Sequence, residues 1–195
     1  GCGFGWHCQY AIEHGAVHAL GIDLSHKMLE EATKRNNSPC IEYKCMAIED
    51  FDYTLESYDI VISSLTFHYL ESFPDICEKV RRCLTPGGTF IFSVEHPVFT
   101  AYGSQDWYYD EQGNILHWPV DRYFSEGKRE AIFLGENVTK FHKTLTTYVN
   151  GLIQNGFEIT GLVEPEPDKT LLDSIPGMRD ELRRPMMLII SSIKK

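Results

Sequence analysis

Apolar and polar residues follow one another in blocks through the first half of the chain, in a pattern that predicts strands separated by helices. Short apolar runs occupy residues 17–22, 41–45 and 58–63. The third run, with its β-branched residues, predicts a strand buried on both faces. Between the first two runs, Ser25 stands at an N-cap position before a helix that carries Leu29 and Ala32. This order predicts βαβ units and therefore an α/β fold with a parallel sheet.

The same alternation continues toward the other end of the chain. Apolar residues four apart, Ile76, Val80 and Leu84, predict a helix that the turn at residues 86–88 (Pro-Gly-Gly) stops. The remaining strands are predicted over residues 89–94, 157–163 and 186–193, and a further helix begins at about Thr144. The last two strands are separated by a long loop rich in Pro and Asp. We therefore predict one domain over residues 1–195, with a Rossmann-like, mostly parallel sheet and flanking helices.

Residues 96–143 break this alternation and are unusually aromatic. Within them, the sequence Glu-Gln-Gly-Asn at 111–114 supplies a hairpin turn between residues 107–109 and 115–118. We interpret residues 96–143 as an inserted antiparallel lid, called the insertion below. Because it follows a strand end, where ligands sit in open α/β sheets, its aromatic residues favour a substrate-binding pocket over a cover for the core.

Composition and charge narrow the class of partner. The chain holds 18 Lys and Arg against 28 Asp and Glu, a net charge of −10, so it lacks the cationic surplus that binds a nucleic-acid backbone. The sequence contains no run of about 18 apolar residues, the length that a membrane-spanning helix needs. The 6 cysteines form no Cys-x-x-Cys pair, which is typical of reduced thiols. We therefore expect a cytoplasmic protein that binds neither nucleic acid nor membrane.

The candidate chemistry begins with the glycine loop, residues 1–5 (Gly-Cys-Gly-Phe-Gly), and with Asp23 at the end of the next predicted strand. Glycines let a backbone approach a ligand closely, and a carboxylate at that strand end can accept hydrogen bonds from both hydroxyls of a ribose. This pairing predicts a nucleotide-type ligand, with a turn that binds no ligand as the alternative. A dinucleotide fingerprint would need a small residue at Trp6 or at Cys8, so a cofactor without a pyrophosphate is favoured.

Several runs of the chain resemble, in order and spacing, successive motifs of the class I S-adenosylmethionine (SAM)-dependent methyltransferases. They are GCGFG, GIDLSHKML, MAIEDF, YDIVISSLTFHYL and LTPGGTFIFSVEHP. The resemblance is greatest to the small-molecule branch that includes ubiquinone- and menaquinone-biosynthesis enzymes, and FHKTLTTYVNGLIQNGF and RRPMMLIISSIKK extend it to nearly the whole chain. It implies an enzyme that transfers a methyl group from SAM to a small-molecule acceptor and releases S-adenosylhomocysteine.

The resemblance also implies roles for residues of this sequence. Gly1, Cys2, Gly3 and Gly5 would surround the methionine part of SAM, Asp23 would bind the ribose, and Leu24 and Met28 would flank the adenine. Ala47 and Ile48 would meet the adenine edge, Ser63, Ser64 and Leu65 would line the floor under the sulfonium, and His68 would pack near the cofactor. Many relatives carry an acid where Ala47 stands, so here a backbone carbonyl or Glu49 would accept from the adenine amino group.

Methyl transfer from a sulfonium needs in-line positioning and exclusion of water, so no dedicated nucleophile is expected. An acceptor that loses a proton would use a general base, and His96 at a strand end and His142 near the end of the insertion are the candidates. A hydrogen-bonded structural histidine is the alternative at both positions. His14 and His18 form His-x-x-x-His, but Gly15 and a predicted helix end lie between them, so no metal site is expected.

Two other functions stay open from the sequence: an NAD(P)-dependent oxidoreductase, against which Trp6 counts, and a SAM-binding partner protein without transfer activity. A homodimer also stays open. In the family fold, a buried strand that ends in an acidic residue precedes the glycine loop and lies between the strands that end at Asp23 and Ser63. No residue before Gly1 supplies this strand, so we expect the natural protein to carry it, with a helix before it.

Overall fold

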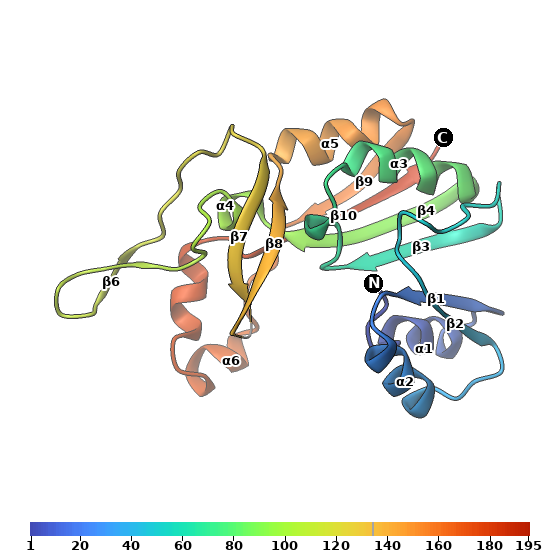
Figure 1. The fold of residues 1–195 in the computed structure, drawn as a ribbon, viewed down its shortest axis with the longest axis horizontal. Coiled ribbons are helices and arrows are strands. Elements are labelled where there is room, and N and C mark those ends of the chain that lie inside the picture. Colours follow the sequence, from blue (N-terminus) through green and yellow to red (C-terminus); the bar gives the residue numbers. More distant parts are fainter. Residues whose placement is uncertain (134) are drawn as a thin grey trace.

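A computed structural model describes residues 1–133 and 135–195, and its elements alternate as predicted through most of the chain (Figure 1). The helices are α1 (Trp6–Glu13), α2 (His26–Arg35), α3 (Phe73–Cys83), α4 (Pro97–Thr100), α5 (Leu145–Gln154) and α6 (Lys169–Ser174), with 3₁₀ helices η1 (Phe67–Tyr69) and η2 (Met178–Arg183). The strands are β1 (Ala19–Asp23), β2 (Ile41–Cys45), β3 (Tyr58–Ser64), β4 (Leu84–Glu95), β5 (Tyr108–Tyr109), β6 (Ile115–His117), β7 (Gly127–Phe133), β8 (Glu136–His142), β9 (Phe157–Val163) and β10 (Met187–Lys194). The α/β class is confirmed.

The strands of the core form two sheets. β1 and β2 pair in parallel, from Ala19 opposite Ile41 to Asp23 opposite Cys45, and the larger sheet has the order β3-β4-β10-β9. β3 runs parallel to β4, whereas β10 runs antiparallel to both of its neighbours. Within the described residues no backbone ladder joins β1 to β3. A further strand is expected at this junction from the family resemblance, and it stays a prediction.

The prediction that β3 is buried on both faces is wrong. Val61 packs against the core, but the side chains of Ile60 and Ile62 are 57% and 43% exposed. Two features explain the difference. Among the described residues β3 has a strand on one side only, beside the junction where a further strand is expected, and α3 and α5 lie together over one face of the sheet (Figure 1), the face opposite to Ile60 and Ile62.

The main core lies between that sheet and the two helices. Phe73 on α3 and Tyr148 on α5 meet edge to face, with ring centroids 4.9 Å apart, and both rings pack near Phe92 of β4. The N-caps of the helices make this placement possible, because Ser72 and Thr144 accept hydrogen bonds from the first turns of α3 and α5. Each helix thus begins at a polar residue and buries the apolar stripe that the sequence predicts.

Several predicted boundaries differ from the structure. The helix expected to run through Leu84 ends at Cys83, because Leu84 already pairs with Tyr58 of β3. The strand predicted over residues 89–94 is β4, which begins at Leu84, so residues 86–88 lie within the strand and do not form the predicted turn. The first strand begins at Ala19, two residues later than predicted. The segment between β9 and β10 is not simply a long loop, since Asp168 caps α6 and Gly177 opens η2. Short helices of this kind carry little periodic signal.

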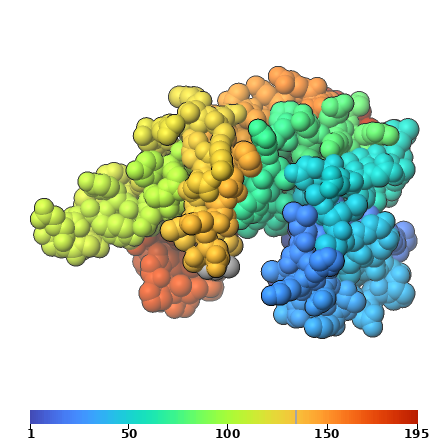
Figure 2. Space-filling view, in the orientation of Figure 1, coloured from blue at the N-terminus to red at the C-terminus, as the bar shows by residue number. Residues whose placement is uncertain are grey.

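The insertion is built from α4 and two antiparallel hairpins, β5–β6 and β7–β8. The predicted turn is present, and Asp110 stabilises it by accepting hydrogen bonds from the backbone of Gln112 and Asn114. Arg184, after η2, lies against the insertion, with its guanidinium carbon 4.3 Å from the ring centre of Trp118 and 4.8 Å from that of Phe99. In Figure 2 the lower part of the insertion and the α6 segment face the N-terminal body, formed by α1, β1, α2 and β2, across a hollow.

Candidate functional site

The glycine loop opens α1, and its shape requires glycine at two positions. Gly5 is the N-cap of α1 with φ 77°, in the left-handed region, and a Cβ there would lie 2.1 Å from the hydroxyl oxygen of Tyr43. A Cβ on Gly1 would lie 2.3 Å from Oγ1 of Thr66. The first contact holds the loop against β2, and the second holds it against the residues that follow β3. The loop therefore spans the junction between the two sheets.

Asp23 fixes the glycine loop to the end of β1. Its Oδ2 accepts a hydrogen bond from the backbone of Gly3 at 2.8 Å, and its Oδ1 accepts one from the backbone of Ser25 at 2.9 Å. The backbone N–H of Cys2 also donates to the carbonyl of Ile22 at 2.8 Å. A carboxylate has about four lone-pair sites, so each oxygen of Asp23 keeps capacity for a ligand hydroxyl. The placement fits a group that binds ribose.

The end of β3, residues 63–66, forms the facing wall. Leu65 adopts φ 52°, rare for a residue with a side chain, and its N–H donates to the carbonyl of Ser93 at 2.9 Å. The hydroxyl oxygens of Ser64 and Ser93 lie 3.2 Å apart. The Ser63 hydroxyl is buried and has no hydrogen-bond partner among the described residues. This wall meets the glycine loop at Thr66. The structure therefore brings the residues predicted to surround the methionine part of SAM close to those predicted beneath the sulfonium.

The residues predicted to meet the adenine lie around Asp23. Leu24 and Met28 are 71% and 47% exposed, which leaves apolar surface without cover. The Met46 N–H donates to the Asp23 carbonyl, and this bond places the turn that contains Ala47 and Ile48 beside it.

The backbone carbonyls of that turn differ in their free capacity. The Ile48 carbonyl already accepts from the Phe51 N–H and from the Tyr53 hydroxyl, so both of its lone pairs are engaged. The Ala47 carbonyl accepts from Asp50 alone among the described residues. It keeps one site for an adenine amino group.

His68 lies immediately behind the β3 end and is 2% exposed. Its Nδ1 accepts a hydrogen bond from the Glu95 N–H at 3.3 Å, and burial lowers its pKa from 6.5 to about 4. The ring is therefore neutral near pH 7. It lies beside the wall as a fixed neutral group in η1.

Protein groups lie against both ring nitrogens of each candidate base. His96 Nδ1 accepts from the Val98 N–H at 3.0 Å, which caps α4, and Nε2 lies 2.8 Å from Glu164 Oε1 without hydrogen-bond geometry among the described residues. His142 is fully buried, and its Nε2 donates to the Tyr123 carbonyl while Nδ1 pairs with the Thr100 hydroxyl, both at 2.8 Å. Burial lowers the pKa of both rings. Neither histidine presents a free lone pair.

Sequence reasoning did not find the polar network behind His68. Lys140 on β8 is 2% exposed, and its ammonium lies 2.6 Å from Glu95 Oε1 and 2.8 Å from Gln105 Oε1. Gln105 in turn donates to Glu95 Oε2 at 2.8 Å. The network joins the end of β4 to two parts of the insertion. The local signal is a lysine between Thr139 and Phe141 of a strand, and it does not distinguish a buried cation from an exposed one.

Two negative findings concern the described residues only. Residues 1–133 and 135–195 hold no group of three or more His, Cys, Asp or Glu side chains that could bind a metal ion. In the same residues, no helix is both long and apolar enough to cross a membrane.

Comparisons with known proteins identify the family. A family model described as a methyltransferase domain matches residues 1–92. A protein from Listeria monocytogenes, whose crystal structure is described as an S-adenosylmethionine-dependent methyltransferase, is 58% identical with a TM-score of 0.96, over 100% of this chain and 87% of that one. A second such methyltransferase, from Mesorhizobium loti, is 39% identical with a TM-score of 0.90, over 100% of this chain and 88% of that one.

A curated Haemophilus influenzae protein described as uncharacterized is 32% identical over 100% of this chain and 79% of its own length. None of these descriptions names quinone biosynthesis, so that branch stays a prediction. Full-length identity to two methyltransferases also counts against the NAD(P)-dependent alternative. The chain belongs to the class I S-adenosylmethionine-dependent methyltransferases.

Proposed function

We propose that the protein transfers the methyl group of SAM to a small organic acceptor and that SAM lies between the glycine loop, Asp23 and the β3 end. One observation carries the proposal: the glycine loop touches Asp23 on one side and Thr66 on the other, at the edge where both parallel strand pairs end. The carboxyl ends of parallel strands are where open α/β sheets bind ligands.

The residues present fit this cofactor. Asp23 has free lone pairs for the two ribose hydroxyls, and the exposed side chains of Leu24 and Met28 would cover the faces of the adenine. The Ala47 carbonyl would accept from the adenine amino group in place of the acid that many relatives carry. Gly1, Cys2, Gly3 and Gly5 would follow the methionine part, and the unpartnered Ser63 hydroxyl, with Ser64 and Leu65, would lie beneath the sulfonium.

In this proposal the chain acts by positioning. Bound SAM supplies an electrophilic methyl group whose C–S bond breaks as the acceptor attacks, leaving a neutral thioether. The wall at residues 63–66, held by hydrogen bonds to Ser93, would lie beneath the acceptor as it approaches the methyl group in line. His96 and His142 would hold their backbone partners and take no proton, because a free lone pair on either ring requires a broken hydrogen bond or ion pair.

The insertion would complete the acceptor side. The insertion follows β4 directly, and its lower part in Figure 2 borders the hollow, so the acceptor would enter between the insertion and the N-terminal body. A small acceptor agrees with the net charge of −10, which does not favour nucleic acid. A cytoplasmic location agrees with cysteines that are all free, and a homodimer stays open.

Isothermal titration of the full natural protein with SAM and with S-adenosylhomocysteine tests the cofactor site. Asp23→Ala should weaken SAM binding by about 10-fold or more, because hydrogen bonds to charged groups contribute about 1.5–3 kcal/mol. Asp59→Ala on β3, remote from the glycine loop, serves as the control. An unchanged affinity for Asp23→Ala would remove this residue from the site.

A SAM-binding protein without transfer activity is the second candidate, and it is favoured by the absence of a free catalytic base at His96 and His142. Incubation with labelled SAM and a pool of small metabolites separates the two. A methylated product supports the transferase. Tight SAM binding with no product from any fraction supports the partner protein.

A further inference from the structure

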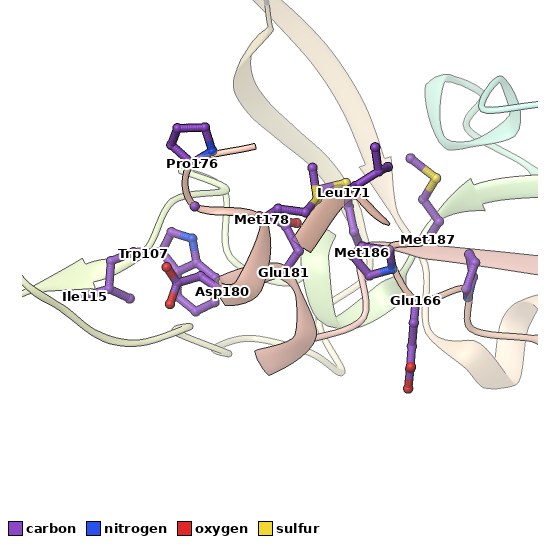
Figure 3. A pocket seen from close by; sticks show the side chains of 13 residues that line it. Trp107, Ile115, Glu166, Leu171, Pro176, Met178, Asp180, Glu181, Met186 and Met187 are labelled. Atoms are coloured by element: carbon purple, nitrogen blue, oxygen red, sulfur yellow. The ribbon is translucent and has the colours of Figure 1, made fainter. Parts of the chain in front are cut away.

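A cavity of about 600 Å³ lies where the insertion meets the chain between β9 and β10 (Figure 3). Trp107, just before β5, and Ile115, the first residue of β6, form one side of it, and Met186 and Met187, at the start of β10, form another. Residues of α6 and η2 complete its lining between these two sides. A volume of this order is typical of small-molecule sites, which hold ligands in cavities of about 300–1,000 Å³.

The walls of this cavity are mostly apolar, and the ionisable side chains in its lining are all carboxylates. Leu171, Met178, Met186 and Met187 provide flexible apolar surface. Among the described residues, no Lys, Arg, His, Ser, Thr, Asn or Gln side chain lines it, whereas Glu166, Asp180 and Glu181 do. The Trp107 indole N–H is the one side-chain donor among the described lining residues, so a carboxylate or phosphate on a ligand would meet that donor alone and would face three carboxylates, which disfavours an anionic occupant.

The three carboxylates still have capacity for a cation. Asp180 pairs with Arg183 at 3.0 Å and Glu181 with Arg184 at 2.8 Å. These arginines lie outside the lining, but their guanidinium carbons are 5.0 and 5.1 Å from the ring centre of Trp107, so they offset the charges of Asp180 and Glu181 beside the cavity. Glu166 takes part in none of the ion pairs found among the described residues, and Figure 3 shows its carboxylate extending away from Met178, at the rim. An ammonium group at the rim would therefore find free carboxylate lone pairs.

The cavity lies at the same edge of the sheet as the cofactor residues. The His96 N–H donates to the Met186 carbonyl at 2.8 Å, and Met187 is paired with Glu95 at the end of β4. β4 also pairs with β3, where Ser64 lies opposite Ser93. Because neighbouring strands lie about 4.8 Å apart, the start of β10 is about 10 Å across the sheet edge from the β3 end. One small molecule can span that distance.

We propose that this cavity binds the methyl acceptor and selects an apolar organic amine, with the apolar body against the methionines and the protonated amino group at the rim carboxylates. The inference rests on the proposed function, because it deepens the acceptor side of the same site. It assigns a substrate class, and it excludes acceptors that carry an acid group at this end.

Three probes that share a phenylethyl body test the charge preference: 2-phenylethylamine, 2-phenylethanol and 3-phenylpropionate. Each is titrated calorimetrically into the natural protein saturated with S-adenosylhomocysteine. The amine should bind tighter than 3-phenylpropionate by about 10-fold or more, since a charged hydrogen bond contributes about 1.5–3 kcal/mol. Equal affinities, or tighter binding of 3-phenylpropionate, would overturn the proposal.

Two substitutions locate the binding. Leu171→Trp fills the cavity and should abolish binding of 2-phenylethylamine, whereas Leu182→Trp, on an exposed residue of η2 outside the lining, should leave it unchanged. Glu166→Gln preserves the shape and should lower the affinity by about 3-fold, as expected for a partly exposed charge pair. Glu158→Gln on β9 is its control. Undiminished amine binding by both Leu171→Trp and Glu166→Gln would place the amine elsewhere and overturn the proposal.

The same titrations separate this inference from the proposed function. A protein that binds S-adenosylhomocysteine but shows no preference for the amine refutes the inference alone. A protein that binds the amine in this cavity but binds neither SAM nor S-adenosylhomocysteine refutes the methyl transfer that we propose, while the cavity keeps its ligand class.

Discussion

Lys140 offers the sharpest test of how the insertion is attached to the sheet. Lys140→Met keeps most of the apolar stem and removes the ammonium, which leaves the Glu95 carboxylate, 13% exposed, with Gln105 as its remaining side-chain partner. Removal of one partner from a buried ion pair costs about 3–5 kcal/mol. Because Gln105 still donates one hydrogen bond to Glu95, we expect the lower end, a loss of about 3 kcal/mol in the free energy of unfolding.

Urea unfolding followed by circular dichroism measures this loss within a double-mutant cycle. Glu95→Gln removes the charge of the partner and keeps its shape, so Lys140→Met with Glu95→Gln should be more stable than the two single losses predict together, by about 1–2 kcal/mol. Lys128→Met is the matched control, because the Lys128–Glu130 pair on β7 has a similar separation of 2.7 Å but exposed side chains. It should cost less than about 1 kcal/mol. A coupling energy below about 0.5 kcal/mol between Lys140 and Glu95 would refute the reasoning.

Two further predictions concern the cofactor side. Gly5→Ala places a Cβ 2.1 Å from the Tyr43 hydroxyl at φ 77° and should weaken SAM binding measured by titration, whereas Gly15→Ala, also at positive φ but with no atom within 4 Å of the new Cβ, should not; equal effects would argue against the contact with Tyr43. His68 has a folded pKa of about 4 against 6.5 when unfolded, so its contribution to stability is complete above pH 6.5 and is lost as the pH falls toward 4, by about 1.4 kcal/mol per pH unit at most. His68→Gln should flatten the measured dependence of the unfolding free energy over that range, and an unaltered profile would contradict the assignment.

Local sequence patterns predict most of the elements on the side of the molecule proposed to bind the cofactor. Ser25 is a side-chain cap of α2, and Asp23 ends β1, because N-caps and strand ends depend on a few neighbouring residues. The same holds for β2 and β9, whose bounds agree with the apolar runs. These features are fixed within about ten residues of chain, the range over which hydrophobic periodicity can be read.

Long-range contacts account for what the sequence did not predict. The Lys140–Glu95 pair joins residues 45 positions apart, and the contact of Gly1 with Thr66 joins two loops, so neither has a local pattern. Ile60 and Ile62 read as buried because a run of β-branched residues reports apolar character but not which face a helix covers. The histidines show the same limit, because only the structure reveals that Val98, Glu164, Thr100 and Tyr123 occupy their nitrogens.

The aromatic rings around Arg184 couple the β5–β6 hairpin to the segment that precedes β10. Phe99 and Trp118 belong to the insertion, whereas Arg184 belongs to the chain that enters β10, and Glu181 holds the guanidinium through both terminal nitrogens. A movement that lifts the β5–β6 hairpin must therefore expose a buried cation or carry residues 178–184 with it. The second path costs less, so these two stretches should exchange their amide hydrogens as one cooperative unit, although about 60 residues separate them in the chain.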